Sequence, residues 1–172
     1  AAIARALEAA GLHAALFDGG GSGSLAWSAA DPALTEVAVG SAFLGTHLFD
    51  GYLDLGAEPA LAFALAVARR PAPAFVTCLG GGFVASGPAG PDRLPRPWLP
   101  EGLALTPLEG AGEVQTPLLV PRGVDVPLGA PVFFRPAKSG ELAEHFAAYL
   151  LVRGDRVEAR APTYRGLGVT LL

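Results

Sequence analysis

A glycine-rich loop carries the residue types best suited to chemistry in this sequence. The segment DGGGSGS (residues 18–24) follows a short apolar run and precedes the expected start of a helix. Because glycines have no Cβ, an anion can approach such a backbone closely, and N–H groups ahead of a helix point toward it. The hydroxyls of Ser22 and Ser24 can donate as well. The loop therefore predicts a phosphate site, with a flexible connector as the alternative.

The same loop matches the dinucleotide-binding fingerprint in its weak form, through Gly21, Gly23 and Ala26. That motif needs a crossover helix long enough to return to the sheet, whereas Pro32 stops this helix after about two turns. A nucleotide P-loop is not favoured either, because no lysine follows the glycines. A phosphate loop followed by a short extra helix is typical of β/α barrels, which is the interpretation we prefer.

Other reactive side chains give weaker signals. Lys138 is the only lysine and lies in a strand-rich region, where a surface cation is a better interpretation than a catalytic amine. The three histidines, His13, His47 and His145, are scattered and form no metal-binding motif. Glu141 lies four residues before His145, a spacing more typical of a solvated helix face than of a metal site. The sequence therefore predicts no metal.

Two further features have ordinary structural interpretations. Cys78 lies in an apolar run and is expected to be an inert core residue. As the only cysteine it cannot form an internal disulfide, which fits a cytoplasmic location. The polar residues Glu109, Glu113 and Gln115 surround glycines, so a structural bend and a site-facing loop remain equally open.

Composition narrows the class of protein. The net charge of -4 includes no basic run, so nucleic acid is not an expected partner. The longest nearly apolar stretch, residues 59–68, is far shorter than the roughly 20 residues that span a membrane. With 23 glycines and 16 prolines the chain should consist of short elements and many turns, and not of a helical bundle. Methionine is absent altogether, so we expect a piece of a longer chain.

The elements around the glycine loop alternate between helix and strand. The pattern predicts a helix from Ile3 that stops at Gly11, a strand over residues 14–17, a short helix over 25–30, a strand over 35–43 and a helix over 48–53. Residues 1–57 therefore have the rhythm of an α/β layer.

From residue 58 onward, apolar runs separated by glycine and proline predict an antiparallel β domain with one short helix near residues 139–146. Gly154 and Asp155 should form the turn of a hairpin. The proline-rich stretch 88–100 should be an ordered surface loop. The remaining predicted strands cover residues 60–68, 74–79, 83–86, 103–108, 114–120, 132–135, 149–152 and 156–161.

Several motifs together resemble the amino acid deaminase/aldolase family, relatives of D-threonine aldolase and D-serine dehydratase within the alanine-racemase-like pyridoxal-phosphate enzymes. They are GGGSGS (19–24), LFDGY (48–52), LGGGFVASGPAG (79–90), GAGEVQTPL (110–118), AKSGEL (137–142) and PTYRG (162–166). The resemblance implies the C-terminal portion of such an enzyme. Its fold class would be α/β plus β: residues 1–57 as the last strands and helices of a β/α barrel, and residues 58–172 as a D-serine-dehydratase-like β domain.

In that family the glycine loop holds the phosphate of pyridoxal phosphate, which assigns the role to Gly20, Gly21 and Ser22, with serine where threonine is usual. The Schiff-base lysine of the family belongs to the first barrel strand, so no catalytic residue is expected in this chain. The positions of the family's metal-binding pair are occupied by Pro136 and Lys138, so no metal is carried over.

The resemblance implies a cytoplasmic lyase that cleaves or dehydrates and deaminates a small D- or β-hydroxy amino acid, and a homodimer. An amino acid racemase of the same fold and a non-catalytic pyridoxal-phosphate-binding protein are the alternatives. Tyr164 and Arg165 are further candidates to face an active site.

Overall fold

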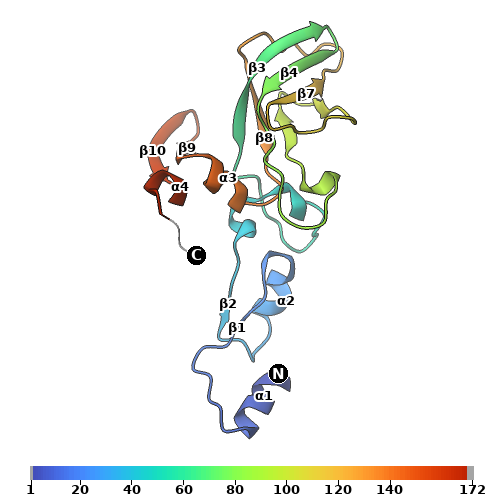
Figure 1. Ribbon diagram of the computed structural model, residues 1–172. Helices are drawn as coiled ribbons and strands as arrows, with labels where there is room; N and C mark the ends of the chain where they lie inside the picture. The colour runs from blue at the N-terminus through green and yellow to red at the C-terminus, as the bar shows by residue number, and fades with distance from the viewer. Residues whose placement is uncertain (1, 170–172) are drawn as a thin grey trace. The chain divides into compact units, whose positions relative to one another are not determined.

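The computed structural model describes residues 2–169 (Figure 1). The chain divides into two compact units, the first ending at Ala60 and the second beginning at Leu61. No helix within the described residues is long and apolar enough to cross a membrane.

The first unit is built around a short pair of parallel strands, β1 and β2, in which Asp18 lies opposite Glu36 and Gly19 opposite Val37. Parallel strands need a crossover, which here contains the glycine loop and a helix of five residues. The elements of the unit are α1 (Ala2–Ala9), β1 (Asp18–Gly19), the 3-10 helix η1 (Ser22–Ser24), α2 (Leu25–Ala29), β2 (Glu36–Val37), and the 3-10 helices η2 (Ser41–Leu44) and η3 (His47–Phe49).

The first two helices predicted for this unit are confirmed, as α1 and α2. Helix α1 stops where Gly11, at φ +74°, takes the left-handed conformation that ends a helix. Helix α2 ends at Ala29. Shortly after it, Asp31 Oδ1 accepts a hydrogen bond from the Ala33 N–H at 2.9 Å, and this bond spans Pro32. The prediction that the helix after the glycine loop is short is therefore confirmed. In the sequence, this short helix is the feature that favours a barrel over a dinucleotide-binding fold.

Three other predictions for this unit were wrong in extent. Residues 14–17 form no strand: β1 begins only at Asp18, although Phe17 O already accepts the Thr35 N–H. The strand predicted over 35–43 is limited to β2, since residues 41–44 turn into η2. The helix predicted over 48–53 is reduced to η3, and turns follow at residues 50–55.

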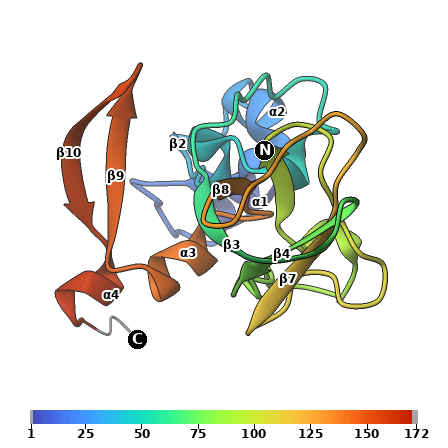
Figure 2. The same ribbon diagram turned by 90° about the horizontal axis from the view of Figure 1, so that it is seen from above.

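The second unit contains an antiparallel six-stranded sheet with the order β5-β8-β3-β4-β7-β6. Its two edge strands, β5 and β6, approach each other, so the sheet curls toward a barrel, as the view in Figure 2 shows for β3, β4 and β7. The strands are β3 (Phe63–Ala72), β4 (Phe75–Leu79), β5 (Arg96–Leu99), β6 (Ala104–Leu105), β7 (Gln115–Leu119) and β8 (Pro131–Arg135).

Alternation of side chains along β3 builds the core of this sheet. Phe63, Leu65 and Val67 are buried, while the alanines between them are exposed. The ring of Phe63 stacks on Phe134 of β8 at a centroid distance of 5.2 Å and meets Phe83 edge-on at 4.9 Å. These contacts fix the register of β3 against β8 and cover the end of the sheet with the segment that follows β4.

That following segment, residues 80–86, includes residues 83–86, which were predicted as a strand but do not form one. Gly81 has a φ of +116°, and a Cβ there would lie 2.4 Å from Thr116 Oγ1. The Thr116 hydroxyl also donates to Gly80 O at 2.6 Å. The glycines thus let the chain pass directly over β7, and the tight turns that result break the strand pattern. Similarly, the strand predicted over 103–108 is only β6, because residues 106–110 turn away.

The end of the second unit is a hairpin between two short helices. Strands β9 (Ala148–Arg153) and β10 (Arg156–Pro162) confirm the predicted hairpin, and its turn contains Gly154 at φ +61°. Helix α3 (Gly140–His145) confirms the predicted helix. Helix α4 (Tyr164–Leu167) was not predicted, so the β unit has two α-helices and not one. Thr163 anchors the junction by donating to Phe146 O at 2.5 Å and accepting from the Gly166 N–H at 3.0 Å.

The proline-rich stretch 88–100 is ordered, as predicted, but it also contributes structure that was not. A 3-10 helix, η4 (Pro91–Arg93), leads into β5, which forms one edge of the sheet. The Ala85 N–H donates to Arg93 O at 2.8 Å and closes the base of the loop.

Substituting Gly81 should destabilise the second unit. We expect Gly81→Ala to lower the free energy of unfolding by about 2 kcal/mol or more, because a Cβ both clashes with Thr116 and is strained at this positive φ. Gly140→Ala is the matched control, since a Cβ there meets open space at the start of α3. Urea denaturation should separate the two; equal effects would contradict this account of the glycine packing.

Candidate functional site

The glycine loop leaves backbone donors unused in the first unit. Within residues 2–169, no protein atom accepts a hydrogen bond from the N–H groups of Gly20, Gly21 or Ser22. Further along the loop, the Ser24 N–H is bonded: it donates to Gly21 O at 3.1 Å in η1. Adjacent N–H groups without acceptors can receive an anion. Gly20, Gly21 and Ser22, which the sequence singled out, therefore present adjacent N–H groups without protein acceptors among the described residues.

Gly20 and Gly21 lack side chains for different physical reasons. Gly20 has a φ of +92°, and a Cβ there would lie 2.5 Å from Ser28 Oγ, so it is required for the loop to pack on α2. Gly21 has extended backbone, and a Cβ there would meet nothing within 4 Å. The first glycine is thus needed by the fold, whereas the second leaves space beside the free N–H groups that a ligand atom can occupy.

The two loop serines have local partners. Ser22 Oγ accepts the Ala42 N–H at 3.0 Å, which ties the loop to the start of η2. Its hydroxyl proton stays available to an anion, because accepting one bond leaves the donor free. Ser24 Oγ lies 3.1 Å from Ser28 Oγ and therefore serves the packing of α2. Each of the two hydroxyls that the sequence proposed as donors therefore has a protein partner in the first unit.

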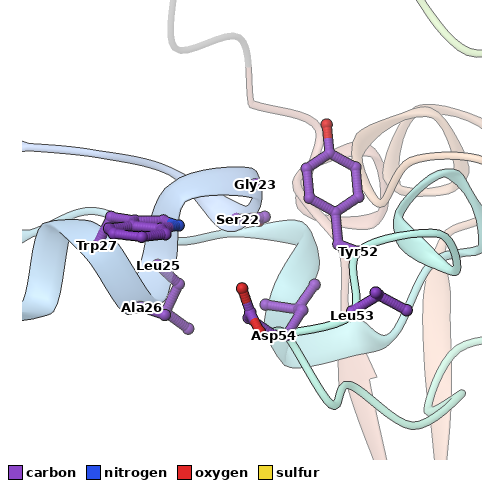
Figure 3. Close-up of a pocket in the computed structure, with 9 residues that line it drawn as sticks. Ser22, Gly23, Leu25, Ala26, Trp27, Tyr52, Leu53 and Asp54 are labelled. Atoms are coloured by element: carbon purple, nitrogen blue, oxygen red, sulfur yellow. The ribbon is translucent and has the colours of Figure 1, made fainter.

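A hollow of about 120 Å³ lies beside the loop and was not predicted (Figure 3). Ser22 and Gly23 form its wall on the loop side, Trp27 on the α2 side, and Tyr52 and Asp54 on the side of the turns after η3. A Cβ on Gly23 would lie 2.8 Å from the Tyr52 ring, so the ring packs directly on the loop. Nothing in the sequence pattern indicated that Trp27 would line a hollow. Only the structure shows that its side chain is 76% exposed in this chain.

Lys138 lies in the second unit and is held by Ser86. Its Nζ donates to Ser86 O at 2.8 Å and lies 3.0 Å from Ser86 Oγ. The Ser86 N–H donates to Glu141 Oε1 at 3.0 Å, so Glu141 and Lys138 both engage the same loop residue. His145 packs against the Phe83 ring at 4.7 Å. Among the described residues, no group of three or more His, Cys, Asp or Glu side chains is arranged to hold a metal ion.

Tyr164 is the side chain of α4 with the clearest electrostatic environment. Desolvation, the charge of Glu144 and a hydrogen bond with it, and the charge of Glu141 raise the pKa of Tyr164 above its ordinary value. Burial and, second, the proximity of Tyr164 raise the pKa of Tyr149. Both phenols are therefore protonated at neutral pH and can donate hydrogen bonds.

The remaining sequence candidates have structural roles. Cys78 is fully buried in β4, and burial raises its pKa to about 11, so the thiol is unreactive at neutral pH. Gln115 pairs with Arg69 across the sheet, and the backbone of Glu113 packs on Gly82. The segment around Glu109 is thus a bend that supports the glycines of residues 80–82.

No protein-family model matches the sequence, and no curated protein matches it at a significant level of similarity. Solved structures do match. D-threonine aldolase from Filomicrobium marinum superposes with a TM-score of 0.78 at 21% identity, covering 94% of this chain and 44% of that one. D-threo-3-hydroxyaspartate dehydratase from Delftia sp. HT23 gives 0.61 at 21%, covering 85% and 43%. An alanine-racemase-like protein from Idiomarina loihiensis gives 0.64 at 15%, covering 85% and 43%.

These likenesses show that the chain shares its fold with part of each of these structures. They confirm the resemblance to D-threonine aldolase and its relatives that the motifs indicated. The chain spans less than half the length of each of these structures.

The two loop glycines should respond differently to substitution. We expect Gly20→Ala to lower the free energy of unfolding by about 1–3 kcal/mol, because of its clash with Ser28 and its positive φ. Gly21→Ala should change it by less than about 0.5 kcal/mol, since its Cβ meets open space. Thermal and urea denaturation provide the measurement. A Gly21→Ala variant as unstable as Gly20→Ala would show that both glycines serve packing alone.

The environment of Tyr164 predicts a dependence on pH. Because folding raises its pKa, the folded state favours the neutral phenol. This stabilising contribution is present below the pKa of the unfolded chain, about 10, and is lost as the pH rises through the folded value. Glu144→Gln should shift the Tyr164 titration toward lower pH, as followed by phenolate absorbance with Tyr164→Phe for subtraction. Glu101→Gln, in an exposed turn, should leave the titration unchanged.

Proposed function

We propose that this chain is the C-terminal part of a pyridoxal-phosphate-dependent lyase that acts on a small D- or β-hydroxy amino acid by aldol cleavage or by dehydration and deamination. Residues 1–57 would be the last strands and helices of its β/α barrel, and residues 58–172 its β domain. The phosphate of the cofactor would be held by Gly20, Gly21 and Ser22. The proposal includes a homodimeric assembly.

The observation that carries the proposal is the set of unused N–H groups in the glycine loop, within a fold shared with enzymes named as an aldolase and a dehydratase. The residues present fit a phosphate group. Three successive N–H groups have no protein acceptor among residues 2–169, and the space beside Gly21 is open. A phosphate offers several acceptor oxygens to such donors.

The chain's own residues would anchor and orient the cofactor. The N–H groups of Gly20 and Gly21 and the hydroxyl of Ser22 would fix the phosphate end, while the Ser22–Ala42 hydrogen bond keeps the loop in place. The lack of a Cβ at Gly20 lets the loop pack on Ser28 of α2. When bound, pyridoxal phosphate supplies the electron sink for cleavage at the substrate's α or β carbon. Lys138, bonded to Ser86, is not assigned to covalent attachment, and the lysine for that role would lie outside this sequence.

An amino acid racemase is the second candidate, favoured by the likeness to the alanine-racemase-like structure. Chiral product analysis of the full-length protein with D- and L-serine and D- and L-threonine distinguishes the two. Aldehyde or keto acid products support the lyase, and the opposite enantiomer supports the racemase. Neither product, with the cofactor bound, would indicate a non-catalytic binder.

Binding of pyridoxal phosphate by the full-length protein tests the loop assignment. The visible absorbance of bound cofactor should survive gel filtration in the parent protein. Gly21→Ala should lower the affinity roughly tenfold or more without loss of stability, because its methyl group would fill the space beside the N–H donors. Gly51→Ala, whose Cβ also meets open space, is the matched control. Lys138→Arg should keep binding intact. Unchanged affinity in Gly21→Ala would refute the phosphate role.

A further inference from the structure

The hollow beside the glycine loop has a chemistry that the proposed function does not use. Two aromatic side chains and one carboxylate, those of Trp27, Tyr52 and Asp54, surround it, and the backbone of Ser22 and Gly23 closes one side. In Figure 3 Trp27 and Tyr52 lie on opposite sides, and Asp54 lies between them with its carboxylate turned toward the Trp27 side. All of these residues belong to the first unit.

Local structure holds these side chains in place. Trp27 is in the middle of α2, whose position on the loop is fixed by the Gly20–Ser28 contact. The Tyr52 ring contacts Phe49 at a centroid distance of 5.4 Å and Gly23 on its other side. Successive turns, with the Tyr52 N–H bonded to Phe49 O and the Leu55 N–H to Tyr52 O, set the path of the chain through Asp54.

The size of the hollow suits a small organic group. Its volume of about 120 Å³ is several times the roughly 30 Å³ share of a water molecule. Buried apolar cavities of roughly 150 Å³ accept a ligand as large as benzene. Leu25 and Leu55 add apolar surface to the lining, so the hollow offers contact to carbon atoms as well as to charge.

The sign of the charge selects the class of ligand. Asp54 is the only acidic residue among the lining residues, none of which is basic, and the faces of indole and phenol rings attract cations. Aromatic rings combined with a carboxylate recognise ammonium groups carrying alkyl substituents, because the charge is met by the acid and the carbons by the rings. An anion or an acidic peptide would be repelled by Asp54.

We propose that the hollow formed by Trp27, Tyr52 and Asp54 is a binding site for a small organic ammonium ion. The site adjoins the loop whose unused N–H groups attract an anion and shares Ser22 with it, but its cation is held by side chains that the phosphate proposal does not use. Trp27 lies on the α2 side of the hollow, where its indole face can contact the cation.

Ligand-detected NMR with the full-length protein tests the site, using tetramethylammonium and choline as probes. Both should show saturable binding, whereas the uncharged carbon isostere of choline and acetate should not. Asp54→Asn should weaken binding roughly two- to fivefold, and Trp27→Leu by a similar factor. Tyr52→Phe should retain it, because the aromatic face remains, whereas Tyr52→Leu should lose it.

Controls decide what each outcome means. Glu8→Gln, which removes one negative charge from α1, is the matched control for Asp54→Asn and should leave affinity unchanged. Circular dichroism and thermal denaturation of each variant establish that the first unit is folded. Three results would each overturn the proposal. They are equal binding of the uncharged isostere, equal losses of affinity in Glu8→Gln and Asp54→Asn, and no probe binding to the parent protein. None of these results depends on pyridoxal phosphate, so the two proposals fail separately.

Discussion

Both units of this protein depend on glycines at which a Cβ atom would collide with a neighbouring segment of the chain. In the first unit Gly20 lies against Ser28, and a Cβ on Gly45 would meet Glu58 O at 1.7 Å. In the second unit Gly81 lies over Thr116 and Gly82 over the backbone of Glu113. At these points the loops need no long helices or strands to hold them, because direct contact between chain segments fixes their course. This explains how a chain with very short elements can present ordered loops.

The constraint connects directly to the candidate site. Packing of Gly20 on α2 holds the following residues so that their N–H groups remain without protein acceptors, while the Ser22 hydroxyl ties the loop to η2. The same contact fixes α2, and with it Trp27, at the edge of the hollow. One local packing contact thus supports two regions of opposite electrostatic preference: the loop donors favour an anion, and the aromatic and acidic side chains beside them favour a cation.

The second unit shows how the same principle organises a sheet. The glycines at residues 80–82 carry the chain across β7 and deliver Phe83 to the aromatic core and Ser86 to Lys138 and Glu141. Thr163 anchors α4 and the hairpin in a comparable way, through its own hydroxyl. The likeness to D-threonine aldolase covers 94% of this chain and therefore includes residues of both units.

The sequence by itself determined the glycine loop, the short helix that Pro32 ends, the hairpin at Gly154, the inert Cys78 and the resemblance to the aldolase group, because each depends on local backbone chemistry or on motif order. Tertiary structure alone decided where apolar runs become strands: residues 14–17 and 83–86 do not, since strand formation requires a partner that a sequence pattern does not reveal. It also separated the packing role of Gly20 from the open position of Gly21, and it brought Tyr52 and Asp54 to Trp27. Tyr52 and Asp54 are about 25 positions from Trp27 in the sequence, and only folding places the three side chains around one hollow.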